Sequence, residues 1–153
     1  MSPLNQLYQE MIIDHGKRPR NFGLSEQANA VLEGFNPLCG DRLTVYVTEK
    51  NGVIEHISFQ GSGCAISIAS ASLMTEAIQG KTVTEAKTLF SVFHPLVMGE
   101  KNSKPTTNER GKLNVLLGVS AFPSRVKCAT LAWHTLLGAL NKQKNTVSTD
   151  NEQ

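Results

Sequence analysis

The stretch LTVYVTEKNGVIEHISFQ, residues 43–60, decides the fold because it contains two strand patterns joined by a turn. Apolar side chains recur with polar ones between them through residues 43–49 and again through residues 53–60, which is typical of a half-buried antiparallel hairpin. A two-residue Asn51-Gly52 turn would scatter the apolar side chains over both faces of that hairpin. We therefore predict a three-residue turn, Lys50-Asn51-Gly52, with the glycine in the left-handed bulge position.

This register gives the predicted hairpin one buried face and one wet face. It pairs Val45 with Ile57, and it pairs Leu43 with Phe59, so that these apolar side chains face the interior together. The wet face carries the following side chains: Thr44, Tyr46, His56 and Ser58. A sheet with one apolar face must be covered by other elements, which the rest of the chain has to supply.

A third strand and several helices surround the predicted hairpin. Residues 30–32 continue the strand pattern, and an amphipathic helix opens the chain and ends before Pro19. Further helices are predicted over these ranges: 64–78, 83–93, 108–119 and 124–140. Thr82 with Glu85 forms a capping signal, and His94-Pro95 ends the second of these helices. Strands first and helices afterwards predict an α+β domain, in which helices cover one face of a small three-stranded antiparallel sheet.

Length and composition place a single domain in residues 1–141, followed by a polar tail, residues 142–153, that we expect to be frayed. Of the 153 residues 40% are hydrophobic, which is enough for one buried core. Lys and Arg total 15 against 13 Asp and Glu, so the net charge of +2 argues against nucleic acid as a partner. No apolar run is long enough to span a membrane, and polar residues interrupt the amino-terminal pattern, so we expect a cytoplasmic protein without a signal peptide.

Three cysteines are the candidate functional residues: Cys39 in NPLCGD, Cys64 in GSGC and Cys128 in SRVKC. An odd number of cysteines in a cytoplasmic chain argues against a disulfide framework and leaves a metal site, a nucleophile or buried hydrophobic filler. We expect each cysteine at a turn or a helix start, where helix N-termini favour the thiolates of Cys64 and Cys128. With Asp41, two residues after Cys39, the three thiolates make a complete four-ligand set for a tetrahedral metal ion.

The phrases around these cysteines resemble the U-type proteins of iron–sulfur cluster assembly, the IscU/NifU-like family. The resemblance rests on NPLCGD at residues 36–41, on GSGCAIS at residues 61–67 and on the third cysteine at the start of the last helix. It also covers Leu7-Tyr8 and the stretch 19–23. It implies a compact α+β fold with three cysteines and one aspartate at one end. It further implies two kinds of partner: a pyridoxal-phosphate-dependent cysteine desulfurase of the SufS type and downstream iron–sulfur assembly proteins.

Three departures from the housekeeping scaffolds of this family resemble its SufU branch. Lys127 stands where those scaffolds carry a histidine, and residues 122–125 lack the paired prolines of a chaperone-recognition segment. The connection between the second and third cysteines is long, with extra material around residues 94–107. The branch implies a zinc-dependent sulfurtransferase whose zinc is bound by four residues: Cys39, Asp41, Cys64 and Cys128. We expect Cys39 to accept the persulfide sulfur, because the adjoining glycine makes it the most mobile of the three cysteines.

Three other functions stay open at this point. The same four residues could hold an iron–sulfur cluster on a non-enzymatic scaffold that passes the cluster to apo-proteins. They could also form a structural zinc site that only stabilises the fold. A cysteine hydrolase would require a histidine oriented beside one cysteine, and no motif supplies it. We assign structural positions to His15, His56, His94 and His134, and a core position to Trp133. The resemblance makes Lys17, Arg18 and Arg20 candidates for docking the desulfurase. Arg125 stays open as a residue that steers an anionic persulfide or only flanks the start of a helix.

Overall fold

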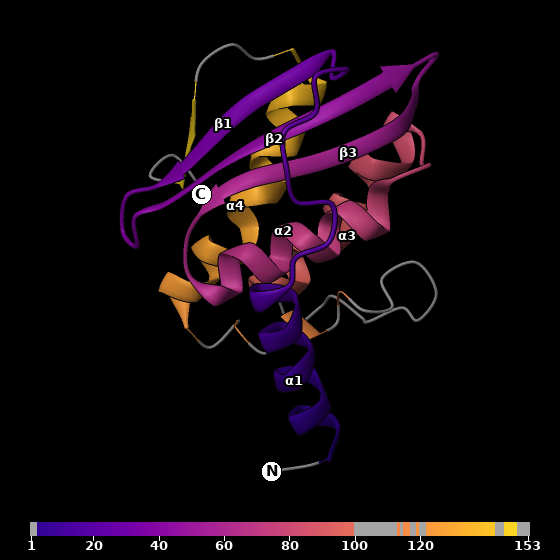
Figure 1. Ribbon diagram of the computed structural model, residues 1–153. Coiled ribbons are helices and arrows are strands. Elements are labelled where there is room, and N and C mark those ends of the chain that lie inside the picture. The colour runs from indigo at the N-terminus through magenta and orange to yellow at the C-terminus, as the bar shows by residue number, and fades with distance from the viewer. Residues whose placement is uncertain are drawn as a thin grey trace.

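The computed structural model describes residues 3–99, 113, 115–116, 119, 122–142 and 146–149 (Figure 1). Its helices and strands follow one another in this order: α1 (Pro3–Lys17), β1 (Ala30–Asn36), β2 (Asp41–Lys50), β3 (Val53–Ser62), α2 (Ala65–Ile78), α3 (Val83–Val97), α4 (Pro123–Leu140) and β4 (Val147–Ser148). The strand order in the sheet is β3-β2-β1-β4, with the first three strands antiparallel and β4 parallel to β1. The α+β prediction is therefore confirmed, with four strands in the sheet rather than three.

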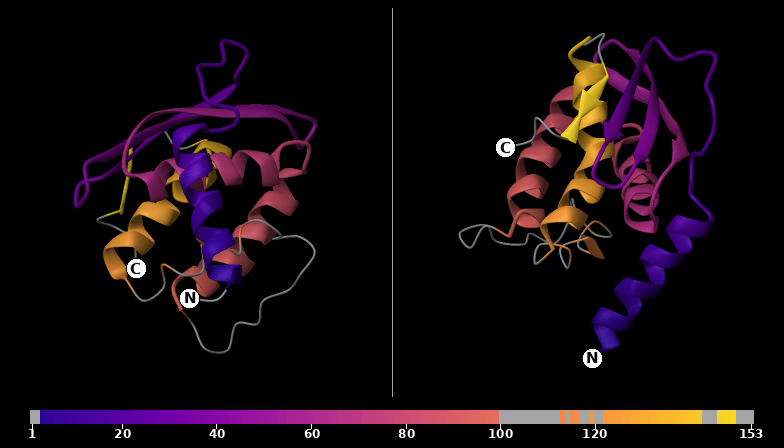
Figure 2. Two further views of the ribbon diagram at one scale, coloured as in Figure 1. Left: turned by 60° about the horizontal axis from the view of Figure 1, so that its bottom comes forward. Right: turned by 90° about the vertical axis from the view of Figure 1, so that its left-hand side faces the viewer.

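Helices cover one face of this sheet. α4 packs across β1 and β2 and α2 packs against β3, while α1 lies on α2 and α3 on α4 (Figure 1 and Figure 2). β1 and α4 approach closely at Gly34, where a Cβ atom would collide with the Thr135 side chain. Trp133 on α4 is fully buried and its ring contacts Phe90 and Phe93 of α3, which confirms its predicted core position.

The turn between β2 and β3 differs from the predicted one. Lys50 pairs with Val53, so the turn consists of the two residues Asn51 and Gly52, whose φ angles are 55° and 79°. A positive φ at both central positions is what a tight two-residue hairpin turn requires. The predicted three-residue turn and the register that followed from it are therefore wrong.

A β-bulge restores the apolar face that a two-residue turn would otherwise scatter. The pairing shifts between Thr48 and Glu49, and Glu55 on β3 is the extra residue. Beyond the bulge Val45 pairs with Phe59, two residues away from the predicted partner. The side chains predicted to face the interior are all fully buried: Leu43, Val45, Ile57 and Phe59. The buried face is thus confirmed, although the register is not.

The outer face of the sheet is less exposed to solvent than predicted. Thr44 is half-buried and His56 is exposed, in line with a wet face. The other two side chains predicted there are buried instead: Tyr46 and Ser58. The chain between α1 and β1 runs along β3, where Phe22 forms a bridge with Phe59, and then crosses the outer face (Figure 1). The sequence of this segment has no periodic pattern, so it does not predict that the segment crosses the outer face of the sheet.

The predicted helices are confirmed where the structure describes them, with shifted ends. At the start of α3, Glu85 N donates to Thr82 Oγ1 and Thr82 N donates to Glu85 Oε1, each at 3.0 Å, which is the predicted capping box. α3 continues through His94-Pro95 to Val97, because a proline in the last turn removes only one backbone hydrogen bond. The predicted helix over 108–119 lies outside the described residues apart from 113, 115–116 and 119, as does the insert beyond residue 99. Within the described residues no helix combines the length and the apolar character that crossing a membrane needs.

Part of the C-terminal stretch is ordered against the sheet. Val147 and Ser148 pair with β1 as strand β4, and the next residue, Thr149, is buried. This pairing satisfies an otherwise open edge of β1, and Val147 packs against the core. The expectation of a frayed tail over residues 142–153 therefore does not hold for these three residues. The domain boundary at residue 141 stays a prediction.

Candidate metal centre

Three of the four predicted ligands come together at the end of the sheet where β1 turns into β2. The ligand atoms of Cys39, Asp41 and Cys128 all lie within 4.8 Å of one another. The sulfur atoms of Cys39 and Cys128 are 3.5 Å apart. A tetrahedral zinc ion with Zn–S bonds of about 2.3 Å holds its sulfurs roughly 3.8 Å apart, so the observed spacing is close to what such an ion needs.

The turn that carries Cys39 consists of four exposed residues, 37–40. Asn36 and Asp41 pair across its base, and Gly40 N donates to Asn36 O at 2.8 Å. Gly40 has a φ of 75°, a backbone conformation that glycine adopts at little cost. Cys39 is exposed at this turn, in the position that the sequence predicts.

Asp41 connects this turn to the start of α2. It is fully buried at the first position of β2. Its carboxylate accepts two hydrogen bonds, at Oδ1 from Cys64 N at 2.8 Å and at Oδ2 from Asn36 Nδ2 at 3.1 Å. A Cβ atom on Gly63 would lie 2.7 Å from Oδ1, so the glycine leaves the room that this carboxylate occupies. The aspartate is therefore held in place by the chain around it.

Cys64 is the N-cap of α2, as the sequence predicts, and its sulfur accepts a hydrogen bond from Ser67 N at 3.4 Å. A hydrogen bond with Cys128, helped by the one from Ser67, lowers the pKa of Cys64 to about 6, although burial and the charge of Asp41 oppose the shift. The hydrogen bond with Cys64, together with burial, raises the pKa of Cys128 well above its usual range. The fourth predicted ligand therefore stands beside the group, linked to it by the bond from Cys64 N to Asp41 Oδ1, but among the described residues its sulfur is not one of the ligand atoms that lie within 4.8 Å of one another.

Cys128 lies deeper in α4 than predicted. The helix begins at Pro123, a residue suited to the first helical position, so Cys128 falls in the second turn. The cysteine is only 2% exposed. The prediction that a helix start exposes this thiolate is therefore wrong. Its sulfur instead lies 3.6 Å from Asn36 Nδ2, a contact with a side chain of β1.

Asn36 belongs to this group, and sequence reasoning missed it. Its side chain is fully buried at the end of β1 and contacts both Asp41 and Cys128. Its oxygen also accepts a hydrogen bond from Leu38 N at 3.3 Å, two residues along the chain. That bond is the mark of an asparagine that starts a turn, and the Asn36-Pro37 pair was the available signal for it.

Within the described residues, the group of close ligand atoms contains no histidine. His15 is buried, with its Nδ1 2.7 Å from Ser72 Oγ, and His94 and His134 contact each other with ring centroids 5.3 Å apart. The group therefore offers no imidazole of the kind that a cysteine hydrolase needs.

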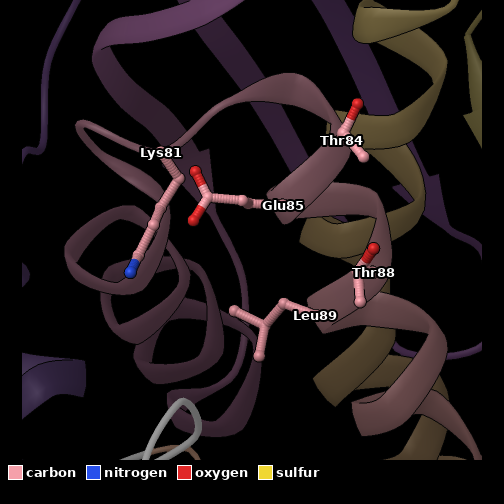
Figure 3. A pocket seen from close by; sticks show the side chains of 5 residues that line it. All are labelled: Lys81, Thr84, Glu85, Thr88 and Leu89. Carbon is pink, nitrogen blue, oxygen red and sulfur yellow. The ribbon is translucent and has the colours of Figure 1, made fainter.

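A separate pocket lies on α3, at the other end of the sheet (Figure 3). α3 starts beside β3, where Thr82 bridges to Val53, whereas the candidate centre lies near the opposite end of β2. The described residues that line the pocket are Lys81, Thr84, Glu85, Thr88 and Leu89. None of these is a cysteine or a histidine, so the pocket takes no part in the candidate centre.

Three comparisons with known proteins bear on this site. A family model described as the NifU-like N-terminal domain matches residues 7–129. The iron–sulfur cluster assembly scaffold protein IscU of Streptococcus pyogenes serotype M1 is 42% identical over 145 residues, which cover 95% of this chain and 89% of that protein. The zinc-dependent sulfurtransferase SufU of Bacillus subtilis (strain 168) is 38% identical over 141 residues, which cover 92% of this chain and 94% of that protein. A crystal structure from Fervidobacterium islandicum AW-1, described as an iron–sulfur cluster assembly scaffold protein for the SUF system, matches with a TM-score of 0.80 at 37% identity and covers 89% of this chain and 98% of that one.

Proposed function

The chain belongs to the family of NifU-like N-terminal domains, and within that family we propose that it is a zinc-dependent sulfur acceptor. In the proposed reaction it takes a persulfide sulfur from a cysteine desulfurase of the SufS type onto Cys39, for use in iron–sulfur cluster assembly. One observation carries this proposal. Cys39 and Cys64 are both exposed, but Cys64 caps α2, whereas Cys39 stands on a turn, and Asp41 and Cys128, whose ligand atoms lie within 4.8 Å of that of Cys39, are buried. A partner protein can therefore reach Cys39 while the rest of the centre stays in place.

The chemistry of the donor set supports zinc. Three sulfurs and one carboxylate oxygen suit a tetrahedral zinc ion, and zinc bound to them would keep the thiolates deprotonated at neutral pH. Cys64 caps α2 and Cys128 lies within α4, so neither can leave the centre without disturbing a helix. Cys39 stands beside Gly40 in an exposed turn, where it can swing outward alone.

The proposed transfer step moves one sulfur atom and needs no outside oxidant or reductant. The Cys39 thiolate attacks the terminal sulfur of the desulfurase persulfide, and a new sulfur–sulfur bond forms on Cys39. The bond between the terminal sulfur and the desulfurase cysteine breaks, and that cysteine leaves as a thiolate. The proton of the terminal sulfur stays with it, so Cys39 ends the step as a persulfide.

A second candidate function is that of a scaffold on which an iron–sulfur cluster is assembled, as the name of the streptococcal relative states for that protein. Three cysteines and an aspartate are also able to hold such a cluster. Lys127 counts against it, because the housekeeping scaffolds that the chain resembles carry a histidine there. Aerobic purification separates the two functions, since a zinc protein is colourless and a cluster protein is brown.

Elemental analysis and a desulfurase assay test the proposal. We expect about one zinc ion per chain in the wild type and much less in Cys64→Ser, which replaces a sulfur ligand by a hydroxyl. The wild type should accelerate turnover of the partner desulfurase, and Cys39→Ala should abolish that acceleration while circular dichroism shows an intact fold. His56→Ala, an exposed change toward the other end of the sheet, is the control and should behave as the wild type. Equal zinc in Cys64→Ser, or full acceleration by Cys39→Ala, would contradict the proposal.

A further inference from the structure

The C-terminal strand reaches the candidate metal centre through two buried side chains. Thr149, the residue after β4, is 1% exposed, and its hydroxyl donates to Asn36 Oδ1 at 2.9 Å. The amide nitrogen of Asn36 in turn lies 3.1 Å from Asp41 Oδ2 and 3.6 Å from Cys128 Sγ. A chain of hydrogen bonds therefore runs from the last strand to two of the proposed ligands. Its first link joins residues that are 113 positions apart in the sequence.

The pairing of β4 with β1 brings Thr149 to this place. Val147 pairs with Gly34 and the next residue pairs with Phe35, so Thr149 stands level with Asn36. Because the two strands are parallel, each step along β4 leads toward the β1–β2 turn, and Figure 1 shows the two strands side by side. The short strand thus places the hydroxyl of Thr149 at the base of the turn that carries Cys39.

The partners of Asn36 fix the direction in which its carboxamide faces. Leu38 N donates to its oxygen, and a backbone N–H cannot accept a hydrogen bond. The hydroxyl of Thr149 donates to the same oxygen. The NH₂ group must therefore point at Asp41 and Cys128, and all four hydrogen-bonding positions of the amide are used.

We propose that Thr149 and Asn36 are positioning residues of the metal centre, through which β4 sets the strength of metal binding. This inference rests on the proposed zinc function. The amide of Asn36 orients the Asp41 carboxylate and draws electron density from the Cys128 sulfur, and the Thr149 hydroxyl keeps the amide turned toward both. Without that hydroxyl the amide oxygen accepts a hydrogen bond from Leu38 N alone. The amide is then less firmly oriented, and its hydrogen bonds to Asp41 and Cys128 weaken.

Substitutions at residue 149 test this inference without changing a ligand. Thr149→Val removes the hydroxyl and keeps the size of the side chain, Thr149→Ser keeps the hydroxyl, and Thr149→Ala is a second variant without it in case the valine variant does not fold. Thr146→Val is the matched control, because Thr146 contacts Glu33 on the surface from the same segment. Zinc affinity is measured by competition with a chromogenic chelator. The sulfur-to-metal charge-transfer bands of the Co²⁺-loaded protein report the ligand sulfurs independently.

We expect Thr149→Val to weaken zinc binding by about threefold to tenfold, which is less than the roughly 10–100-fold typical of partners in direct contact with ligands. Its Co²⁺ charge-transfer band should move to lower energy, because a sulfur that receives a weaker hydrogen bond gives up an electron more easily. Thr149→Ser and Thr146→Val should match the wild type in both measurements, so that the effect follows the hydroxyl.

Four results would overturn the inference. If the wild type binds zinc and the variants without the hydroxyl at residue 149 keep its affinity and spectrum, the inference fails while the proposed function stands. An equal loss in Thr146→Val, or no rescue by Thr149→Ser, would assign the effect to strand pairing or packing instead. If the wild type binds neither zinc nor Co²⁺ through its cysteines, the inference and the proposed function fail together.

Discussion

The turns at the two ends of strand β2 each contain a glycine with a positive φ, but they differ in length and in the burial of the residues that flank them. Gly40 in the β1–β2 turn has a φ of 75°, and Gly52 in the β2–β3 turn has a φ of 79°. The β2–β3 turn is flanked by exposed and half-buried residues and only reverses the chain. The β1–β2 turn is flanked by Asn36 and Asp41, which are both fully buried. Buried polar groups cost free energy unless they are paired, so the pairing of Asn36 and Asp41 with each other and with their neighbours distinguishes the β1–β2 turn from the β2–β3 turn.

The largest predicted effect concerns the buried face of the sheet, which packs against the helices. Phe59→Ala removes a fully buried ring and should lower the free energy of unfolding by about 3–5 kcal/mol. Thr44→Ala, at a half-buried position on the outer face, should cost far less. Denaturant unfolding measures both changes, and the zinc content of the folded variants should equal that of the wild type. A larger loss for Thr44→Ala than for Phe59→Ala would show that the two faces of the sheet are misassigned.

The two turn glycines give a matched test of the comparison. At Gly40 and at Gly52 nothing lies within 4 Å of an added Cβ atom, so alanine would be opposed only by the positive φ. Each change should lower the free energy of unfolding by about 1–2 kcal/mol. Only Gly40→Ala should also weaken zinc binding in chelator competition, because strain in that turn displaces Cys39. Equal zinc affinities for the two variants would break the comparison.

The smallest predicted effect concerns a surface ion pair beside the β1–β2 turn. Arg42 on β2 pairs with Glu33 on β1, and the two side chains are 53% and 36% exposed. Solvent screens pairs of this kind, so Glu33→Gln should lower the free energy of unfolding by only about 0.2–1 kcal/mol. Zinc affinity should stay unchanged. A measurable loss of zinc in this variant would show that exposed residues next to the turn also support the centre.

Two of the three cysteine positions could be predicted because the signals around them are local. The Asn36-Pro37 pair and Gly40 mark a turn, and the glycines before Cys64 mark the start of a helix. Neither signal depends on distant parts of the chain. The depth of Cys128 depends on where α4 begins and on how it packs across β1 and β2, which no local pattern specifies.

The incorrect predictions share a physical cause, which is that distant or compensating contacts decided the outcome. The bulge at Glu55 allows a two-residue turn and a single apolar face to coexist, so the apolar pattern alone could not choose the turn. Tyr46 is buried on the outer face, over which the segment after α1 crosses. Thr149 lies in the polar tail that the sequence predicts to be frayed, and no local pattern indicates its partner Asn36, which lies 113 positions away.

The most direct test of the proposed function is the position of the sulfur after reaction with a cysteine desulfurase. The protein is incubated with the desulfurase and free cysteine, digested under conditions that preserve persulfides, and its three cysteine peptides are compared by mass spectrometry. We expect one added sulfur atom on the peptide that contains Cys39 and little on those that contain Cys64 or Cys128. Added sulfur mainly on the Cys64 or the Cys128 peptide, or on none of the three, would contradict the claim that the turn cysteine is the acceptor.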